Sequence, residues 1–355
     1  MLEVSIQKTL GNFTLDTSFK AHKGVLGILG SSGCGKSLTL KSLAGLSTPD
    51  EGIITLNGQI LYSSESKINL PARKRNIGYV FQNYALFPHL TVFKNIAYGI
   101  SHLDKDTQKK KVVHMIQKMQ LAGLENHYPS QLSGGQQQRT ALARTLITEP
   151  SLLLLDEPFS ALDSHIKHLL EKELLNIIKE NYDGIVLLVT HNMEEAYRLC
   201  NHIMVVDKGK TIQIGTKDDI IFSPKSVAVA QMTSCKNIFK TQVVKEENGY
   251  YTLKSNALIF KSTKKHTLKS SSVYAGIRAH TIKVFPSNTV LKENMFSCHI
   301  LEKTDSIFST TVIVDASGCI LTIEIPKSDS LKITNDSITI YIPPEEIFLM
   351  DANKG

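Results

Sequence analysis

Eight consecutive residues, 30–37, have the composition of a loop that binds an anion: Gly-Ser-Ser-Gly-Cys-Gly-Lys-Ser. An apolar run at 25–29 precedes them and a helical pattern at 38–44 follows, so the context is strand, glycine loop and helix. Glycines let backbone N–H groups turn toward a phosphate, and the positive end of the helix dipole strengthens the attraction. Lys36 would reach the β- and γ-phosphates of a nucleotide, and the Ser37 hydroxyl would be one ligand of Mg²⁺. The alternative is a glycine-rich turn that binds nothing, but such a turn does not need a Lys-Ser pair at a helix start.

Two adjacent carboxylates, Asp156 and Glu157, follow a run of four leucines at 152–155. Carboxylates at the end of a buried strand are costly to retain unless a cation or a proton transfer uses them. Asp156 would hold Mg²⁺, and Glu157 would polarise the water that attacks a γ-phosphate. The alternative is a strand that ends in two solvent-facing acids.

Two further polar residues follow predicted strands. Gln82 comes after the strand at 77–81 and His191 after the strand that ends at 189–190. A parallel sheet collects its ligand groups at such ends. We therefore expect Gln82 to hold the metal or the attacking water, and His191 to donate to the γ-phosphate as charge develops. A structural histidine is the alternative for His191.

A second anion cradle is predicted at Leu-Ser-Gly-Gly-Gln, residues 132–136, which opens a helix at 136–147. Ser133 is a good N-cap, and the two glycines after it leave the first N–H groups of the helix bare. Capped helices are common, so this segment is informative because it accompanies the first loop and the Asp-Glu pair.

The periodicity that positions these residues predicts an α/β domain. Buried strands alternate with helices at 151–155, 165–180, 184–189 and 193–200, which indicates a mostly parallel sheet covered on both faces. Hairpins are expected at 2–19 and 53–62, and a helical subdomain at about 83–147. Beyond about 235, short strands separated by polar turns predict an all-β barrel domain over 236–355.

Composition excludes several classes of protein. The formal charge of +7 comes from 40 Lys+Arg against 33 Asp+Glu in 355 residues, and no basic stripe interleaved with aromatics appears, so no nucleic-acid partner is expected. No apolar run approaches the ~20 residues of a membrane span. The five cysteines are scattered and lack zinc spacing, so we expect reduced thiols in a cytoplasmic location.

The motifs stand in the order and spacing of those in ABC transporter ATPases, which this sequence resembles over about residues 1–235. The Walker A, Q-loop, signature, Walker B, D-loop and switch-histidine motifs correspond to 30–37, 82, 132–136, 152–157, 160–163 and 191. The resemblance implies catalytic roles for Glu157, His191 and Gln82, with Mg²⁺ held by Ser37, Gln82 and Asp156. It also implies ATP contacts from a larger set: Phe13, Gly30, Ser31, Ser32, Gly33, Cys34, Gly35, Lys36, Ser37, Leu38, Ser133, Gly134, Gly135, Gln136 and Asp163.

In that family two subunits sandwich the nucleotides, so the resemblance implies a homodimer in which Ser133, Gly134 and Gly135 contact ATP bound to the other copy. Asp163 would couple the two sites. Where the family usually carries a tyrosine that stacks on adenine, this chain has Phe13, which keeps the π face.

Finer similarity is to the ATP-binding subunit of bacterial molybdate importers, carried by segments such as Arg-Asn-Ile-Gly-Tyr-Val-Phe-Gln at 75–82. The β region, with Gly-Ile-Arg-Ala-His at 276–280, resembles the TOBE/Mop domains of solute importers. The resemblance implies ATP-driven import at the cytoplasmic face of the membrane, with two permease subunits and an external solute-binding protein. Sulfate, tungstate or a sugar is the alternative cargo. A soluble non-transport ABC ATPase, a P-loop kinase and an oxyanion sensor are the alternatives from other classes.

Overall fold

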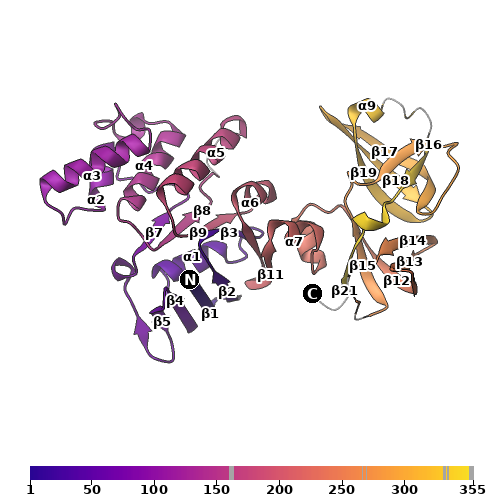
Figure 1. Cartoon of the computed structure of the whole chain (residues 1–355), viewed down its shortest axis with the longest axis horizontal. Coiled ribbons are helices and arrows are strands. Elements are labelled where there is room, and N and C mark those ends of the chain that lie inside the picture. Colours follow the sequence, from indigo (N-terminus) through magenta and orange to yellow (C-terminus); the bar gives the residue numbers. More distant parts are fainter. Residues whose placement is uncertain (160–163, 266, 269, 331–332, 334–335, 352–355) are drawn as a thin grey trace. The chain divides into compact units, whose positions relative to one another are not determined.

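The structure, a computed structural model, describes residues 1–159, 164–265, 267–268, 270–330, 333 and 336–351. The chain divides into two compact units, Met1–Lys217 and Asp218–Gly355, which are described separately (Figure 1). Within the described residues, no helix combines the length and the apolar character that crossing a membrane requires.

In the first unit, eleven strands of the described chain form one sheet in the order β6-β5-β4-β1-β2-β11-β10-β3-β9-β8-β7. The strands are β1 Leu2–Leu10, β2 Phe13–Ala21, β3 Gly24–Leu29, β4 Glu51–Leu56, β5 Gln59–Ser63, β6 Ile68–Asn69, β7 Ile77–Val80, β8 Leu152–Asp156, β9 Ile185–Thr190, β10 His202–Asp207 and β11 Lys210–Thr216. The expected hairpins are confirmed as β1-β2 and β4-β5.

The sheet is mixed. Strands β10, β3, β9, β8 and β7 are parallel neighbours, whereas β2, β1, β4, β5 and β6 form an antiparallel arm. Every residue of β8 and of β9 is buried, which explains why both read as unbroken apolar runs. Because the central strands are parallel, their carboxyl ends meet at one edge. The loop after β3, Asp156 and His191 all lie at that edge.

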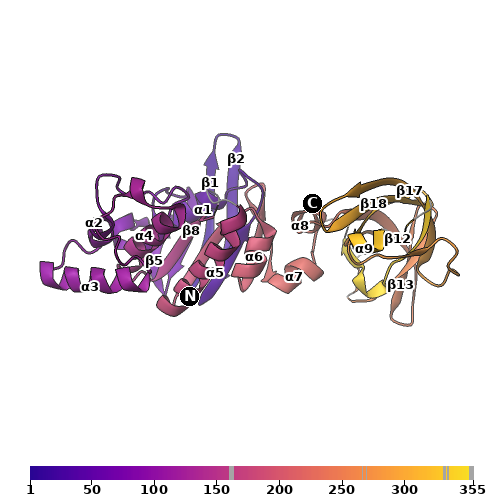
Figure 2. The ribbon, with the colours of Figure 1, turned by 90° about the horizontal axis from the view of Figure 1, so that it is seen from above.

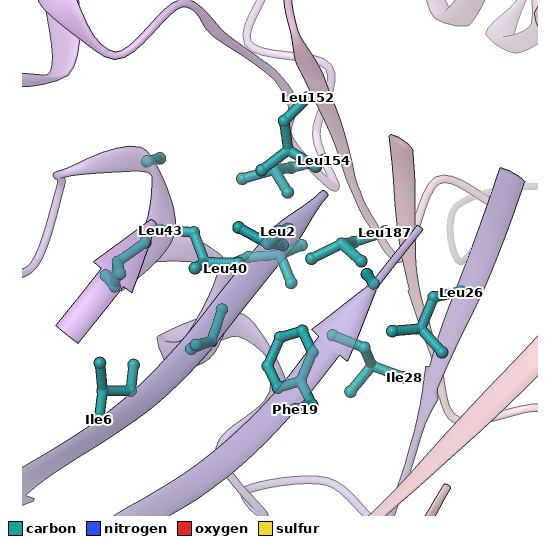
Figure 3. Close-up of a cluster of buried hydrophobic side chains, with 14 of the residues drawn as sticks. Leu2, Ile6, Phe19, Leu26, Ile28, Leu40, Leu43, Leu152, Leu154 and Leu187 are labelled. Atoms are coloured by element: carbon teal, nitrogen blue, oxygen red, sulfur yellow. The ribbon is translucent and has the colours of Figure 1, made fainter. Parts of the chain in front are cut away.

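A shared core ties this edge to the arm. Leucines of α1 (Lys36–Ala44) pack with Leu152 and Leu154 of β8, Leu187 of β9 and residues of β1 and β2 (Figure 3). The four leucines of β8 are at most 2 % exposed. Each such burial contributes about 1.5–3 kcal/mol, which offsets the cost of placing a carboxylate at the end of the strand.

The helices of this unit include the expected helical subdomain, where 83–147 contains helices and no strand in a stretch that the structure describes throughout. Figures 1 and 2 show these helices gathered at one end of the unit, with α3 outermost. The helices after α1 are η1 Ala72–Lys74, α2 Val92–Tyr98, α3 Lys105–Lys118, η2 Pro129–Gln131, α4 Gly134–Leu146, α5 Ser164–Asn181 and α6 Met193–Leu199.

The second unit carries two antiparallel sheets of five strands each in its described part, β14-β13-β12-β15-β21 and β16-β20-β17-β18-β19. One apolar core contains residues of both sheets, so the expected all-β character is confirmed. The elements are α7 Lys217–Phe222, α8 Val227–Met232, β12 Asn237–Glu247, β13 Tyr250–Ser255, β14 Leu258–Thr263, β15 Ser272–Ile277, β16 Lys283–Pro286, β17 Met295–Asp305, β18 Ser309–Ala316, β19 Cys319–Pro326, α9 Lys327–Ser330, β20 Ser337–Tyr341, η3 Pro344–Glu346 and β21 Phe348–Asp351.

Arg278 explains why the second unit begins before its first strand. Its guanidinium donates to the backbone oxygen of Ile221, which lies in α7, and to that of Thr233, the residue that caps the end of α8. These contacts tie both short helices to the β sheets. Helices α7 and α8 therefore group with the second unit, whereas the sequence analysis assigned residues 218–235 to the first domain.

Candidate nucleotide site

The glycine loop joins β3 to α1 and has the backbone that an anion cradle requires. Gly33 and Gly35 have φ of +79° and +105°, conformations that side chains rarely adopt. A Cβ on Gly30 would lie 2.4 Å from the backbone oxygen of Val206, so only glycine fits there. Helix α1 begins without a side-chain cap and without an acidic residue in its first turn. Its first N–H groups thus have no competing side-chain acceptor, and the dipole favours a bound anion.

The other end of α1 is satisfied from within the protein. Arg75, only 1 % exposed, donates to the backbone oxygens of Ser42 and Leu43 at 2.8 and 2.7 Å. A cation at the carboxyl end of a helix complements an anion at its amino end. The sequence analysis named Arg75 only as part of the 75–82 segment and missed this role, because the burial of Arg75 depends on tertiary packing.

Lys36 lies inside the loop. Its ammonium donates to the backbone oxygens of Gly30 and Ser31 at 2.8 and 2.9 Å, and the side chain is 4 % exposed. It also lies 4.0 Å from a carboxylate oxygen of Glu157. A buried cation held by carbonyls and one nearby carboxylate suits a phosphate-binding lysine, because phosphate oxygens would supply the missing charge.

Ser37 and Asp156, two predicted metal ligands, are brought together. The Ser37 hydroxyl donates to Asp156 Oδ1 at 2.8 Å, which leaves the lone pairs of the serine oxygen available to a cation. The Tyr79 hydroxyl, which the sequence analysis did not single out, donates to Asp156 Oδ2 at 2.7 Å. In the described part of the chain no three His, Cys, Asp or Glu residues are grouped to hold a metal by themselves. Two oxygen ligands beside a phosphate loop fit Mg²⁺, which takes few protein ligands and keeps waters and phosphates as the others.

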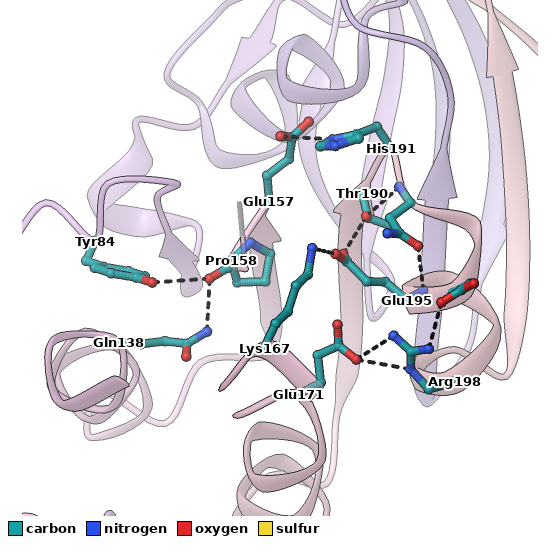
Figure 4. Close-up of polar contacts among 12 residues, drawn as sticks. Tyr84, Gln138, Glu157, Pro158, Lys167, Glu171, Thr190, His191, Glu195 and Arg198 are labelled. Atoms are coloured by element: carbon teal, nitrogen blue, oxygen red, sulfur yellow. Dashed lines mark hydrogen bonds and ion pairs between the residues drawn. The ribbon is translucent and has the colours of Figure 1, made fainter. Parts of the chain in front are cut away.

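Glu157 turns away from the strand that precedes it. Its φ is +46°, an uncommon conformation for a residue other than glycine, and its N–H donates to the backbone oxygen of Val189 on β9. This turn carries the carboxylate to His191, whose Nδ1 lies 3.3 Å from Glu157 Oε2 (Figure 4). Glu157 is 19 % exposed and His191 is 54 % exposed, so both remain accessible to a ligand.

A buried network supports the segment that carries His191. Thr190 donates to Glu195 Oε2 at 2.6 Å and accepts from the N–H of Asn192, while Lys167 on α5 pairs with the same glutamate (Figure 4). The residues on both sides of His191 are thereby fixed. No motif in the sequence pointed to Glu195, which lies in the first turn of α6.

Gln82 leaves the sheet at the same edge. Val80 is in register with Leu155 on the neighbouring parallel strand, so the turn that contains Gln82 begins level with Asp156 and Glu157. The two residues after Asn83, Tyr84 and Ala85, have φ of +59° and +43°. Arg144 of α4 holds this strained turn by donating to their backbone oxygens at 2.9 and 2.7 Å.

The second predicted cradle is the capped start of α4. Ser133 accepts from the N–H of Gln136 at 3.4 Å, and the Gln136 side chain accepts from the N–H of Ser133 at 2.9 Å, which is a capping box. Ser133 and Gly134 are exposed. Helix α4 is linked to the residue after Glu157 through Gln138, which donates to the Pro158 oxygen (Figure 4).

The remaining predicted contacts fall into two groups. Phe13 is half-buried, and its Cζ lies 3.0 Å from where a Cβ on Gly35 would stand, so the ring flanks the glycine loop. Leu38 is half-buried and packs against the core. Asp163 lies outside the described residues. Its role, like the ligand contacts of all the predicted site residues, stays a prediction.

Known proteins resemble the chain in sequence and fold. Residues 15–160 match the ABC transporter family. The molybdate/tungstate import ATP-binding protein of Archaeoglobus fulgidus is 40 % identical over 237 residues, which are 67 % of this chain and 95 % of that protein. The sulfate/thiosulfate import ATP-binding protein of a Synechocystis strain is 44 % identical over 62 % of each chain. The spermidine/putrescine import ATP-binding protein of Acetivibrio thermocellus is 38 % identical over 82 % of this chain and 80 % of its own.

A solved structure agrees with these relatives. The dimeric ATP-binding cassette MJ0796, in a post-hydrolysis state bound to ADP and Pi, superposes with a TM-score of 0.52 at 26 % identity, over 61 % of this chain and 99 % of that chain. Sequence, fold and the geometry around the glycine loop therefore agree. The chain belongs to the ATP-binding proteins of the ABC transporter family.

Proposed function

We propose that this chain hydrolyses ATP to drive import of an oxyanion, with molybdate as the cargo. The observation that carries the hydrolytic part is the position of the Glu157 carboxylate, 4.0 Å from the Lys36 ammonium and 3.3 Å from His191 Nδ1. Asp156, the residue before Glu157 at the end of β8, accepts from Ser37 of α1. A base, a phosphate-binding cation and a metal-binding pair are the parts that phosphoryl transfer to water requires.

Each residue has a separate task. Lys36 and the N–H groups at the start of α1 bind the β- and γ-phosphates, and Glu157 accepts a proton from the attacking water. His191 donates to the γ-phosphate as its charge develops, and Gln82 orients the water or a metal ligand. Mg²⁺, held by Ser37 and Asp156, would neutralise charge on the phosphates when bound.

Two copies are proposed to act together. The start of α4, where Ser133 and Gly134 are exposed and Gly135 is buried, is expected to contact ATP on a partner copy, and Asp163 to couple the two sites. The solved relative described above is a dimer, which supports this arrangement.

Coupling to a membrane permease would use the turn after Gln82. Arg144 fixes that turn to α4, whose first residues are the proposed trans contact. A movement of α4 on ATP binding would therefore be transmitted to the turn, and through it to two permease subunits at the cytoplasmic face. The proposed division of labour is nucleotide binding by 1–235 and a TOBE/Mop-like regulatory role for 236–355.

The cargo rests on relatives. A molybdate/tungstate import protein matches over 95 % of its own length and 67 % of this chain. Sulfate is the second candidate, because a sulfate/thiosulfate import protein is 44 % identical. The sequence resemblance to molybdate importers at 75–82 favours molybdate.

The experiment is ATP hydrolysis by the chain co-purified and reconstituted with its membrane partner and solute-binding protein, titrated separately with molybdate, tungstate and sulfate. Stimulation by molybdate or tungstate alone supports the proposal. Stimulation by sulfate alone would identify sulfate, rather than molybdate, as the cargo. Hydrolysis indifferent to all three anions would refute the assignment as an oxyanion importer. A Glu157→Gln preparation provides the background rate from contaminating ATPases.

A further inference from the structure

Tyr79 makes a polar contact beside the proposed phosphate site, and the sequence analysis gave this residue no role there. It lies on β7, in register with Leu154 of β8, two residues before Asp156. Its ring stacks against Phe81 with a centroid distance of 4.3 Å. This packing directs the hydroxyl to Asp156 Oδ2, at 2.7 Å.

Both carboxylate oxygens of Asp156 are therefore occupied. Ser37 donates to Oδ1 at 2.8 Å and Tyr79 donates to Oδ2, and the aspartate is 7 % exposed. A carboxylate held at both oxygens cannot rotate about its terminal bond.

We propose that Tyr79 is a positioning residue for the metal site. By fixing the plane of Asp156, it keeps Oδ1 on the Ser37 hydrogen, so the lone pairs of the serine oxygen point away from the aspartate and toward a cation. Loss of the Tyr79 contact would let the Asp156 carboxylate rotate, and the Ser37 hydroxyl that donates to it would then change its orientation as well. The inference rests on the proposed function only in needing a metal-nucleotide complex at this site; it does not depend on transport or on cargo.

Tyr79→Phe tests the idea, because it keeps the ring and its packing on Phe81 and removes only the donor. The measurement is calorimetric titration of Mg²⁺, and separately of Mn²⁺, into the isolated chain saturated with a non-hydrolysable ATP analogue. We expect metal affinity to fall about tenfold, as the loss of one hydrogen bond to a charged group implies. Affinity for the analogue in EDTA should change less than about twofold.

Tyr62→Phe is the matched control. Tyr62, on the antiparallel arm of the same sheet, is 5 % exposed, and its hydroxyl donates to the Pro49 oxygen at 2.8 Å. Tyr79 is partly buried. We expect both variants to lose similar thermal stability in EDTA, and only Tyr79→Phe to lose metal affinity. Equal metal affinities in the two variants would overturn the proposal and leave Tyr79 as a packing residue. The transport assay above, with a different sample and readout, tests the proposed function independently.

Discussion

The starts of helices α1 and α4 use glycine in opposite ways. Helix α1 follows Gly35, at φ +105°, and has no side-chain cap. Helix α4 follows Ser133, whose side chain and that of Gln136 satisfy each other's N–H groups. The first helix thus presents open donors inside the subunit beside Lys36, whereas in the second the Ser133 cap already satisfies the N–H of Gln136.

This difference predicts that the start of α1 binds an anion strongly within one chain, whereas the start of α4 binds one only when a partner presents it. Open N–H groups, a dipole and a buried lysine make a site that one chain can fill alone. A capped helix start retains only weak residual N–H donors. It therefore contributes to anion binding only when a second copy of the chain presents the anion. Variants of the two helix starts should therefore behave differently in the isolated chain and in the assembled protein.

The largest effect is expected from Glu157→Gln, opposite the start of α1. Removal of the base should lower the rate of ATP hydrolysis by about 10²–10⁴-fold while leaving ATP affinity nearly unchanged. The measurements are steady-state phosphate release and equilibrium nucleotide binding. Glu149→Gln, a surface carboxylate paired with Lys111, is the control and should hydrolyse normally. Retained turnover in Glu157→Gln would remove this residue from its role.

Lys36→Ala tests the open start of α1 itself. We expect affinity for ATP to fall about 10–100-fold in the isolated chain, because a hydrogen-bonding cation that faces the phosphates is lost. Titration with a fluorescent ATP analogue measures it. Lys41→Ala, on the same helix but exposed, controls for net charge. If both variants bound equally well, the loop would not be the phosphate site.

Phe13→Ala tests whether the aromatic ring beside the glycine loop contributes to adenine binding. Loss of a stacking face should weaken binding of an adenine nucleotide by about 1–3 kcal/mol, while Phe13→Tyr should bind as the original does. Competition between ATP and inorganic triphosphate in the same binding assay separates stacking from phosphate contacts. A triphosphate affinity that falls as far as the ATP affinity would place the effect in the loop.

Ser133→Ala, at the capped start of α4, should have the smallest effect on the isolated chain. Loss of the cap should cost about 1 kcal/mol of stability and leave ATP affinity unchanged. Hydrolysis by the assembled protein should nevertheless fall, because Ser133 is proposed to contact ATP bound to the partner copy. Thr91→Ala removes the cap of α2, a hydrogen bond of the same 3.4 Å length to Lys94, and should lower stability alone. Identical behaviour of the two variants would make the α4 cap purely structural.

Local features of the fold could be read from the sequence with good accuracy. The hairpins, the helical region at 83–147 and the buried strands β8 and β9 follow from periodicity and turn residues. Helices α7 and α8, six residues each, were missed because so short a segment shows no full helical period. Their assignment to the second unit depends on Arg278, a contact from 45 residues beyond Thr233.

The candidate site divides in the same way. The glycine loop, the Asp156-Glu157 pair and His191 were predictable because each is a short segment whose residue types report its own backbone and charge. Their proximity was an inference from strand ends, and the observed Glu157-His191 and Ser37-Asp156 contacts agree with it. Metal and nucleotide contacts at these residues stay predictions.

By itself, then, the sequence determined where the chain turns, which strands are buried and which residue types stand at the strand ends. Only the tertiary structure decided the neighbours: β7 beside β8 places Tyr79 on Asp156, and packing under α1 buries Arg75 at the helix's carboxyl end. The reason is physical. Backbone conformation depends on adjacent residues, whereas a side-chain hydrogen bond between strands depends on the order and register of the sheet, which many residues far apart in the chain fix together.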